Sequence, residues 1–172
     1  MKSAPELYSA KRTNLGFDEV NYGVGGIKLF ELAELENGQI GYSVKADGQS
    51  LTGRGPGDWR EDWLVIGYET ALGDPVFLST QPPHPVFTAF HGQGTWTPDL
   101  IAPSVERFWD CLDAFRRFAH RRGSPAELEL NPPEEQEIED YLSEVLHLCD
   151  GNVDTVVFWS VQAQIGMNAE DS

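Results

Sequence analysis

Residues 62–90 carry the sequence DWLVIGYETALGDPVFLSTQPPHPVFTAF, and this stretch decides the fold. Gly73-Asp74 and Pro82-Pro83 interrupt it, and such pairs are typical of turns between strands. The runs between the turns are rich in β-branched and aromatic residues and lie at about 62–69, 75–79 and 85–91. Because the connections are too short for helical crossovers, these runs predict consecutive antiparallel strands that pair as a meander.

The sequence before this stretch extends the sheet and adds a long loop. The segment NYGVGG at 21–26 predicts a structural turn, because it lacks the endings of the phosphate-binding glycine loops. Strands are expected at 27–30 and at 39–44, with one helical turn at 31–36 between them. Residues 46–59 predict a loop, since several glycines and a proline interrupt any regular pattern there.

The apolar period lengthens after Ile101, which predicts helices. Ser104 is a suitable cap for a helix that ends at Gly123. The last turns of this helix carry basic residues that complement its dipole: Arg116, Arg117, His120, Arg121 and Arg122. Residues 91–96 predict a turn leading into a short strand before this helix begins.

Further helices are expected near both ends of the chain. Residues 124–130 predict a linker, and Asn131 is a suitable cap for a second helix that ends at Asp150-Gly151. Residues 152–164 favour a third helix, although their valines also suit a strand. A short helix at 5–12 could be capped by Ser3. The prediction is one α+β domain over 1–172, sheet-rich at 21–100 and helical at 103–165, with a curved antiparallel sheet packed against helices.

The charge of the chain selects among partners. Twenty-eight acidic residues oppose twelve Lys and Arg, which gives a formal net charge of −16. Binding to nucleic acids or anionic membranes normally requires basic residues that replace counterions, so neither partner is expected. Such a field favours association with a basic protein, mainly through faster encounter. The alternative is that the acidity serves only solubility.

Two cysteines and the ends of the chain bear on its compartment. Cys111 and Cys149 lack metal-binding spacing and lie in helical patterns, which predicts buried free thiols. Burial would also make Cys111 a poor nucleophile. The N-terminus has no apolar run typical of a secretory signal, and no segment is long and apolar enough for a membrane span. A reducing cytoplasm is therefore expected, and no cofactor is.

A catalytic alternative rests on histidines around one predicted strand. His84 and His91 flank residues 85–91, and Asp74 precedes them in a turn. A metal site would need these side chains to converge, whereas seven extended residues separate the histidines by about 20 Å. A hydrolase using His84, His91 and Asp99 stays the second hypothesis for function.

A partner-binding surface is expected around the glycine-containing loop. Trp59 lies at its tip among acidic residues, and exposed aromatic side chains are typical of binding hot spots. Trp63, by contrast, is expected to begin a strand and cover the core. The predicted partner-binding residues are Trp59, Glu61, Asp62, Glu69 and Asp74.

The order of these segments resembles the SUKH superfamily, which includes Smi/Knr-type cell-wall regulators and bacterial toxin-immunity proteins. The resemblance covers about residues 21–115 and is carried by the segments IKLFELAEL (27–35), DWLVIG (62–67), GDPVFL (73–78), PVF (85–87), IAPS (101–104) and FWDCL (108–112). It implies a curved antiparallel sheet packed against helices and no catalytic residues. The N-terminal helical part is abbreviated, and NYGVGG replaces the usual Asn-Gly-Gly turn of the family.

The resemblance also implies a function. Many bacterial members neutralise a toxin, often a nuclease, by protein binding. The leading expectation is a cytosolic immunity protein that blocks a basic toxin with an acidic sheet face and loop. A regulatory scaffold without a toxin partner is the alternative.

Overall fold

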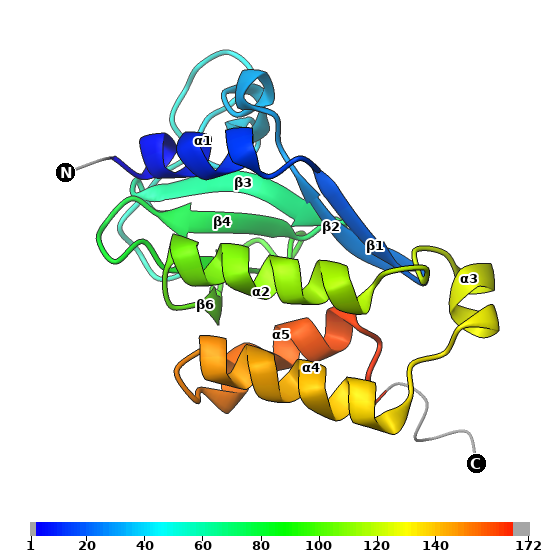
Figure 1. The fold of residues 1–172 in the computed structure, drawn as a ribbon. Coiled ribbons are helices and arrows are strands. Elements are labelled where there is room, and N and C mark those ends of the chain that lie inside the picture. The colour runs from blue at the N-terminus through cyan, green and yellow to red at the C-terminus, as the bar shows by residue number, and fades with distance from the viewer. Residues whose placement is uncertain (1–2, 167–172) are drawn as a thin grey trace.

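Six antiparallel strands in sequential order form one curved sheet in the computed structural model, which describes residues 3–166 (Figure 1). Its strands are β1 (Glu19–Tyr22), β2 (Gly25–Leu29), β3 (Trp63–Glu69), β4 (Pro75–Ser79), β5 (Val86–Thr88) and β6 (Asp99–Ala102). The predicted meander of residues 62–90 is confirmed, because β3, β4 and β5 pair in succession. The glycine-rich segment also forms a turn, since it joins β1 to β2 and Gly23 has a positive φ of 56°.

The helices lie on one side of this sheet (Figure 1). They are α1 (Ala4–Asn14), α2 (Val105–Phe118), α3 (Pro125–Leu130), α4 (Glu135–Leu148) and α5 (Val153–Gln162). Ser3 and Ser104 cap α1 and α2 as predicted, each by accepting a backbone N–H of the first turn. The predicted helix at 152–164 is confirmed by α5. Together the layers make an α+β fold.

The main hydrophobic core fills the space between the sheet and the helices. Ile66, Val76 and Leu78 face it from β3 and β4 and are fully buried. Phe108 and Phe115 of α2 meet them from the other side, and both contact Trp159 of α5. Burying side chains of this size stabilises the fold by about 1.5–3 kcal/mol each.

A second hydrophobic cluster covers the opposite face of the sheet. Val65 and Phe77 alternate with the residues of the main core, as successive strand residues must. The segment between η2 (Asn37–Gln39) and β3 supplies the cover, together with residues 91–98. Every residue of β4 is therefore buried, and this part of the sheet offers no open face to a partner.

The strand predicted at 39–44 is wrong. These residues contribute only isolated bridges, of which one joins Ile40 to Val44. The side-chain amide of Gln39 takes the place of a strand: its nitrogen donates to the Val65 oxygen at 2.8 Å, and its oxygen accepts from the Val65 nitrogen at 3.0 Å. The strand predicted at 85–91 is also shorter than expected, ending at Thr88.

The linker predicted at 124–130 is wrong as well, because these residues contain α3. Asn131 follows α3 as its C-cap, and α4 begins later, after Glu134. Arg122 explains the local arrangement. It is buried, not part of a solvated basic cluster, and it donates to the carbonyls of Phe118 and Asn131 and to the carboxylate of Glu137. One side chain therefore connects the ends of α2 and α3 to the first turn of α4.

Candidate functional site

Trp59 does not lie on the surface, so the exposed anchor predicted there is wrong. Its side chain is only 1% exposed and forms the centre of the second hydrophobic cluster. Its ring contacts those of Trp63, Phe77 and Trp96 with centroid separations of 4.7–5.2 Å. Trp59 is buried because the face of the sheet around Phe77 is aromatic and the loop covers this face with the Trp59 side chain. Burial among these rings also raises the pKa of Tyr42.

Glu69 is also buried, and its carboxylate stabilises the turn between β3 and β4. One oxygen accepts the backbone N–H groups of Leu72 and Asp74, at 2.7 and 3.1 Å, and the other accepts that of Ala71 at 3.0 Å. A carboxylate with three internal donors is committed to the turn. Glu69 therefore does not offer the free negative charge that the sequence predicted for partner binding.

Asp74 is buried and paired with His91. Its Oδ1 accepts the backbone N–H of His91 at 2.9 Å and lies 2.6 Å from Nδ1 of the ring. An ionised carboxylate can only accept, so this geometry suits a ring that carries a proton on Nδ1. The His91 side chain is half exposed. The pair ties the start of β4 to the segment that follows β5.

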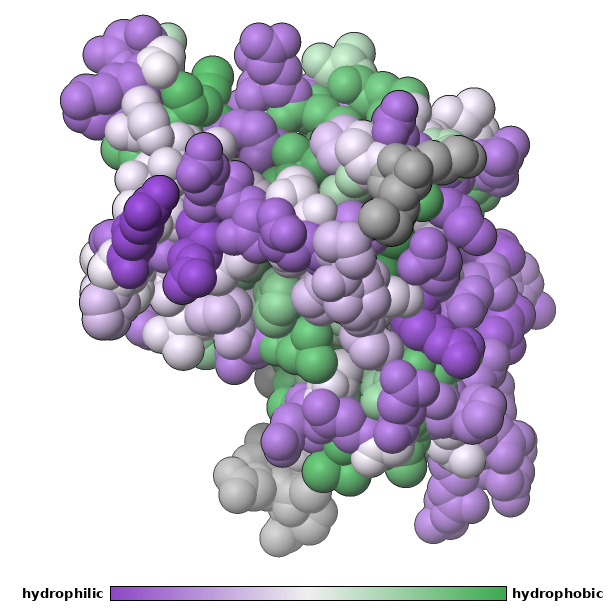
Figure 2. All heavy atoms as spheres, turned by 90° about the vertical axis from the view of Figure 1, so that its left-hand side faces the viewer, coloured by the Kyte–Doolittle hydropathy of each residue, from purple (hydrophilic) through white to green (hydrophobic). Residues whose placement is uncertain are grey.

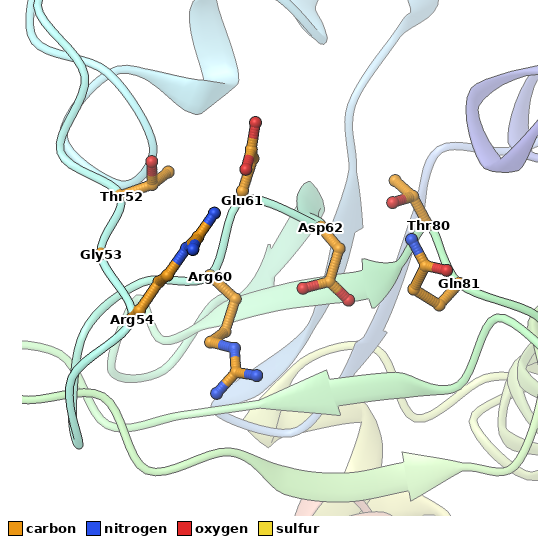
Figure 3. A pocket seen from close by; sticks show the side chains of 8 residues that line it. All are labelled: Thr52, Gly53, Arg54, Arg60, Glu61, Asp62, Thr80 and Gln81. Carbon is orange, nitrogen blue, oxygen red and sulfur yellow. The ribbon is translucent and has the colours of Figure 1, made fainter.

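Glu61 and Asp62 are the two predicted binding residues that face solvent, and both line a shallow polar hollow (Figure 3). The Asp62 carboxylate accepts a hydrogen bond from Ser79 Oγ at 2.7 Å. In Figure 3, the Glu61 and Asp62 side chains point in opposite directions, and Arg54 and Arg60 lie beside them. Two basic side chains balance two acidic ones, so this hollow lacks the negative surface that was expected. Glu61 and Asp62 thus lie together here, whereas Trp59 is buried in the second hydrophobic cluster and Glu69 and Asp74 lie at the β3–β4 turn.

The histidines of the catalytic hypothesis have separate environments. His84 is buried before β5, with Nδ1 3.1 Å from the Ser79 oxygen, whereas His91 pairs with Asp74 after that strand. Asp99 is exposed at the start of β6. No group of three or more His, Cys, Asp or Glu within residues 3–166 is placed to hold a metal ion.

Cys111 and Cys149 are free and buried, as predicted. Their sulfur atoms lie 3.8 Å apart, between α2 and the end of α4. The hydrogen bond with Cys149, together with burial, raises the pKa of the Cys111 thiol. The same hydrogen bond lowers the pKa of Cys149. Burial and this hydrogen bond both disfavour the thiolate form of Cys111.

A groove that the sequence did not predict runs between α5 and the strands β5 and β6. It has a volume of about 640 Å³, and we call it the α5 groove. Its apolar lining residues are Leu72, Phe90, Leu100, Ile101, Val157, Phe158 and Val161. Leu72, Phe90, Val157 and Val161 are each more than half exposed, which is unusual for side chains of this kind gathered in one place.

Helix α5 shows why this groove is apolar. Thr155, Trp159 and Gln162 form its buried face, and the Trp159 ring nitrogen donates to the Ile101 oxygen of β6 at 2.8 Å. A second face carries valines, of which Val153, Val157 and Val161 form an exposed row at i, i+4 and i+8. The valines that made this segment ambiguous in the sequence were the available indication of a second apolar face.

Acidic residues border the α5 groove. Asp99 and Asp154 are exposed on its two sides, at the starts of β6 and α5. Beyond it, residues 127–144 contain eight acids and no Lys, Arg or His: Glu127, Glu129, Glu134, Glu135, Glu137, Glu139, Asp140 and Glu144. Within residues 3–166, internal ion pairs occupy basic side chains such as Arg12, Lys28 and Arg117.

Comparison of the chain with protein-family models, curated proteins and solved structures finds no match. Among residues 3–166, no helix combines the length and the apolar character that crossing a membrane requires. The candidate site therefore rests on the chemistry of the α5 groove itself.

Proposed function

We propose that this protein is a non-catalytic binding module that engages a basic protein, acting as an immunity protein that blocks a cationic toxin domain in the cytoplasm. The observation that carries this proposal is the α5 groove, an exposed apolar surface on a molecule of net charge −16. Exposed apolar patches with polar borders are typical of protein-binding sites. Figure 2 shows that one face of the molecule carries patches of hydrophobic side chains among hydrophilic ones.

The charge supports a basic partner. An excess of sixteen negative charges accelerates encounter with a cationic surface and slows encounter with an anionic one. The resemblance to the SUKH superfamily supports the narrower role, since it implies toxin neutralisation by binding. The free thiols of Cys111 and Cys149 suit a reducing compartment.

The proposal is tested by isolating the partner from the source cells by cross-linking and rebuilding the complex from purified components. The association rate should fall about tenfold or more as salt is raised, because screening removes the steering. Reversing exposed acids in α4, as in Glu139→Lys with Asp140→Lys, should slow association. An association rate that changes neither with salt concentration nor with these charge reversals would contradict the proposal. Inhibition of the partner distinguishes an immunity protein from a regulatory scaffold.

A hydrolase is the second candidate, and the Asp74–His91 pair is the observation in its favour. A buried carboxylate that orients a half-exposed imidazole leaves Nε2 available as a general base. If this is its role, the purified protein hydrolyses a substrate among esters, amides and phosphoesters, and His91→Gln abolishes the activity while thermal stability stays close to that of the wild type.

A further inference from the structure

We infer that the α5 groove binds an amphipathic helix of the basic partner, with apolar residues on one face and Lys or Arg on its flanks. This inference rests on the proposed function and adds the location and the chemistry of the contact. Exposed apolar side chains line part of the groove, with Phe90 and Leu72 57% and 66% exposed and Val157 58% exposed. Such side chains gain free energy when an apolar partner removes them from water, by roughly 25 cal/mol per Å².

The dimensions of the groove suit a helix. The part of α5 that lines the groove extends from Asp154 to Gln162, which at 1.5 Å per residue is about 12 Å. That length matches about two turns of a partner helix, enough for anchors at i, i+3, i+4 and i+7. The opposite wall comes from Leu100 of β6 and from Phe90. A partner helix would thus contact a helix on one side and the sheet edge on the other.

An extended peptide added to the sheet is a poorer fit. β6 is the last strand of the sheet, but its outer edge is covered by α5, and Trp159 already donates to the Ile101 oxygen there. Strand addition needs free backbone groups along that edge. Insertion of helix side chains into the groove needs no free backbone groups.

One polar group in the groove lacks a partner. Thr155 lines the groove, is 1% exposed, and its Oγ1 has no hydrogen-bond partner within residues 3–166. This hydroxyl is enclosed, so the exposed apolar side chains and the border carboxylates are expected to make the contact with the partner.

The charge argues for a foreign cationic helix and against a second copy of this chain. Asp99 and Asp154 border the groove, and two copies would bring like-charged borders together while each carries a net charge of −16. Lys or Arg on a partner helix would instead meet these carboxylates. The occupant that fits this groove is therefore a helix that carries both basic and apolar side chains.

The test uses a fluorescein-labelled peptide of roughly 14 residues with Leu at i, i+3, i+4 and i+7 and Lys elsewhere, a pattern that makes one apolar helical face. Its binding to the full chain is followed by fluorescence anisotropy. A peptide with the same composition but with Leu spread around the helix is the control. We expect the amphipathic peptide to bind at least about tenfold more tightly, because only it can insert its anchors together.

Variants of the protein locate the contact. Val157→Asp and Val161→Asp, both at exposed positions, should each weaken the amphipathic peptide about tenfold or more. Leu130→Asp makes the same change at an 87% exposed position in α3 and should leave the affinity within about twofold. Asp99→Asn should reduce the salt dependence of binding, since it removes one border charge.

Three outcomes would overturn the inference: equal binding of the two peptides, equal binding by the Val157→Asp and Leu130→Asp variants, or a dimer of the wild type that Val157→Asp dissociates. The cognate partner separates this inference from the proposed function. If the partner binds the Val157→Asp variant as tightly as the wild type and its association still depends on salt, the proposed function stands and the α5 groove is not the binding site.

Discussion

The loop before β3 and the helix α5 differ in how deeply their apolar side chains are buried, and the difference is the reverse of what their sequences suggest. The loop contains Gly53, Gly55 and Pro56, yet it delivers Trp59 to the centre of a hydrophobic cluster, where the side chain is 1% exposed. Helix α5 is apolar on most of its surface, yet it leaves Val157 58% exposed. This comparison shows that the burial of a side chain depends on whether its segment covers an apolar face of the sheet. Both faces around β4 are apolar, so even an irregular loop becomes part of the core.

The largest expected effect tests the buried loop. Trp59→Ala removes an aromatic side chain in contact with Trp63, Phe77 and Trp96 and should lower the free energy of unfolding by about 3–5 kcal/mol, because a cavity of that size does not collapse. Urea denaturation followed by circular dichroism measures it. Val157→Ala is the matched control on α5 and should cost far less. Equal losses for the two variants would mean that the loop and helix do not differ as described.

The second prediction tests whether a buried acidic residue, Glu69, contributes to the stability of the fold. Glu69→Ala leaves three backbone N–H groups of the β3–β4 turn without their acceptor, and we expect a loss of about 1–3 kcal/mol. Glu69→Gln keeps one accepting oxygen and should lose less. The thermal midpoints of the two variants provide the measurement. A wild-type midpoint for Glu69→Ala would show that the carboxylate is dispensable for the turn.

The ion pair between Arg122 and Glu137, in the first turn of α4, is expected to make a smaller, pH-dependent contribution to the free energy of unfolding. The backbone N–H of Glu134 and the Arg122 guanidinium lower the pKa of Glu137. Its folded-state pKa lies below the unfolded value, so its contribution is complete above about pH 4.3 and disappears as pH falls through the folded value. Since the carboxylate is half exposed, Glu137→Gln should cost at most about 1 kcal/mol at neutral pH. The difference from the wild type should vanish in acid, as unfolding curves at several pH values can show. A difference that grows in acid would contradict the assignment.

The smallest expected effect concerns the exposed valines. Val157→Asp should change the free energy of unfolding by less than about 0.5 kcal/mol, because the side chain is already largely in water. Differential scanning calorimetry is sensitive enough. A large loss would mean that Val157 contributes to the core, and the binding data on this variant would then have to be replaced by those on Val161→Asp.

Much of the fold followed from local patterns, and most of the candidate site did not. The turns at Gly73-Asp74 and the alternation around Leu64 and Ile66 predicted the central strands correctly. The strand at 39–44 failed because the amide of Gln39 bonds to the backbone of Val65, a contact between residues far apart in the chain. The expected exposure of Trp59, Glu69 and Asp74 was wrong for a similar reason. An acidic residue such as Glu69 has the same sequence pattern whether its carboxylate contacts water or three backbone N–H groups.

The sequence by itself determined the class of fold, the meander, most of the helices and the strong negative charge, because turn residues, apolar period and composition are local quantities. Only the tertiary structure decided that Trp59, Glu69 and Asp74 are internal and that an apolar groove opens beside α5. Exposure depends on what packs against a residue, and those neighbours come from distant parts of the chain. For this reason the sequence could predict acidic and aromatic residues for binding, but not that Trp59, Glu69 and Asp74 are buried.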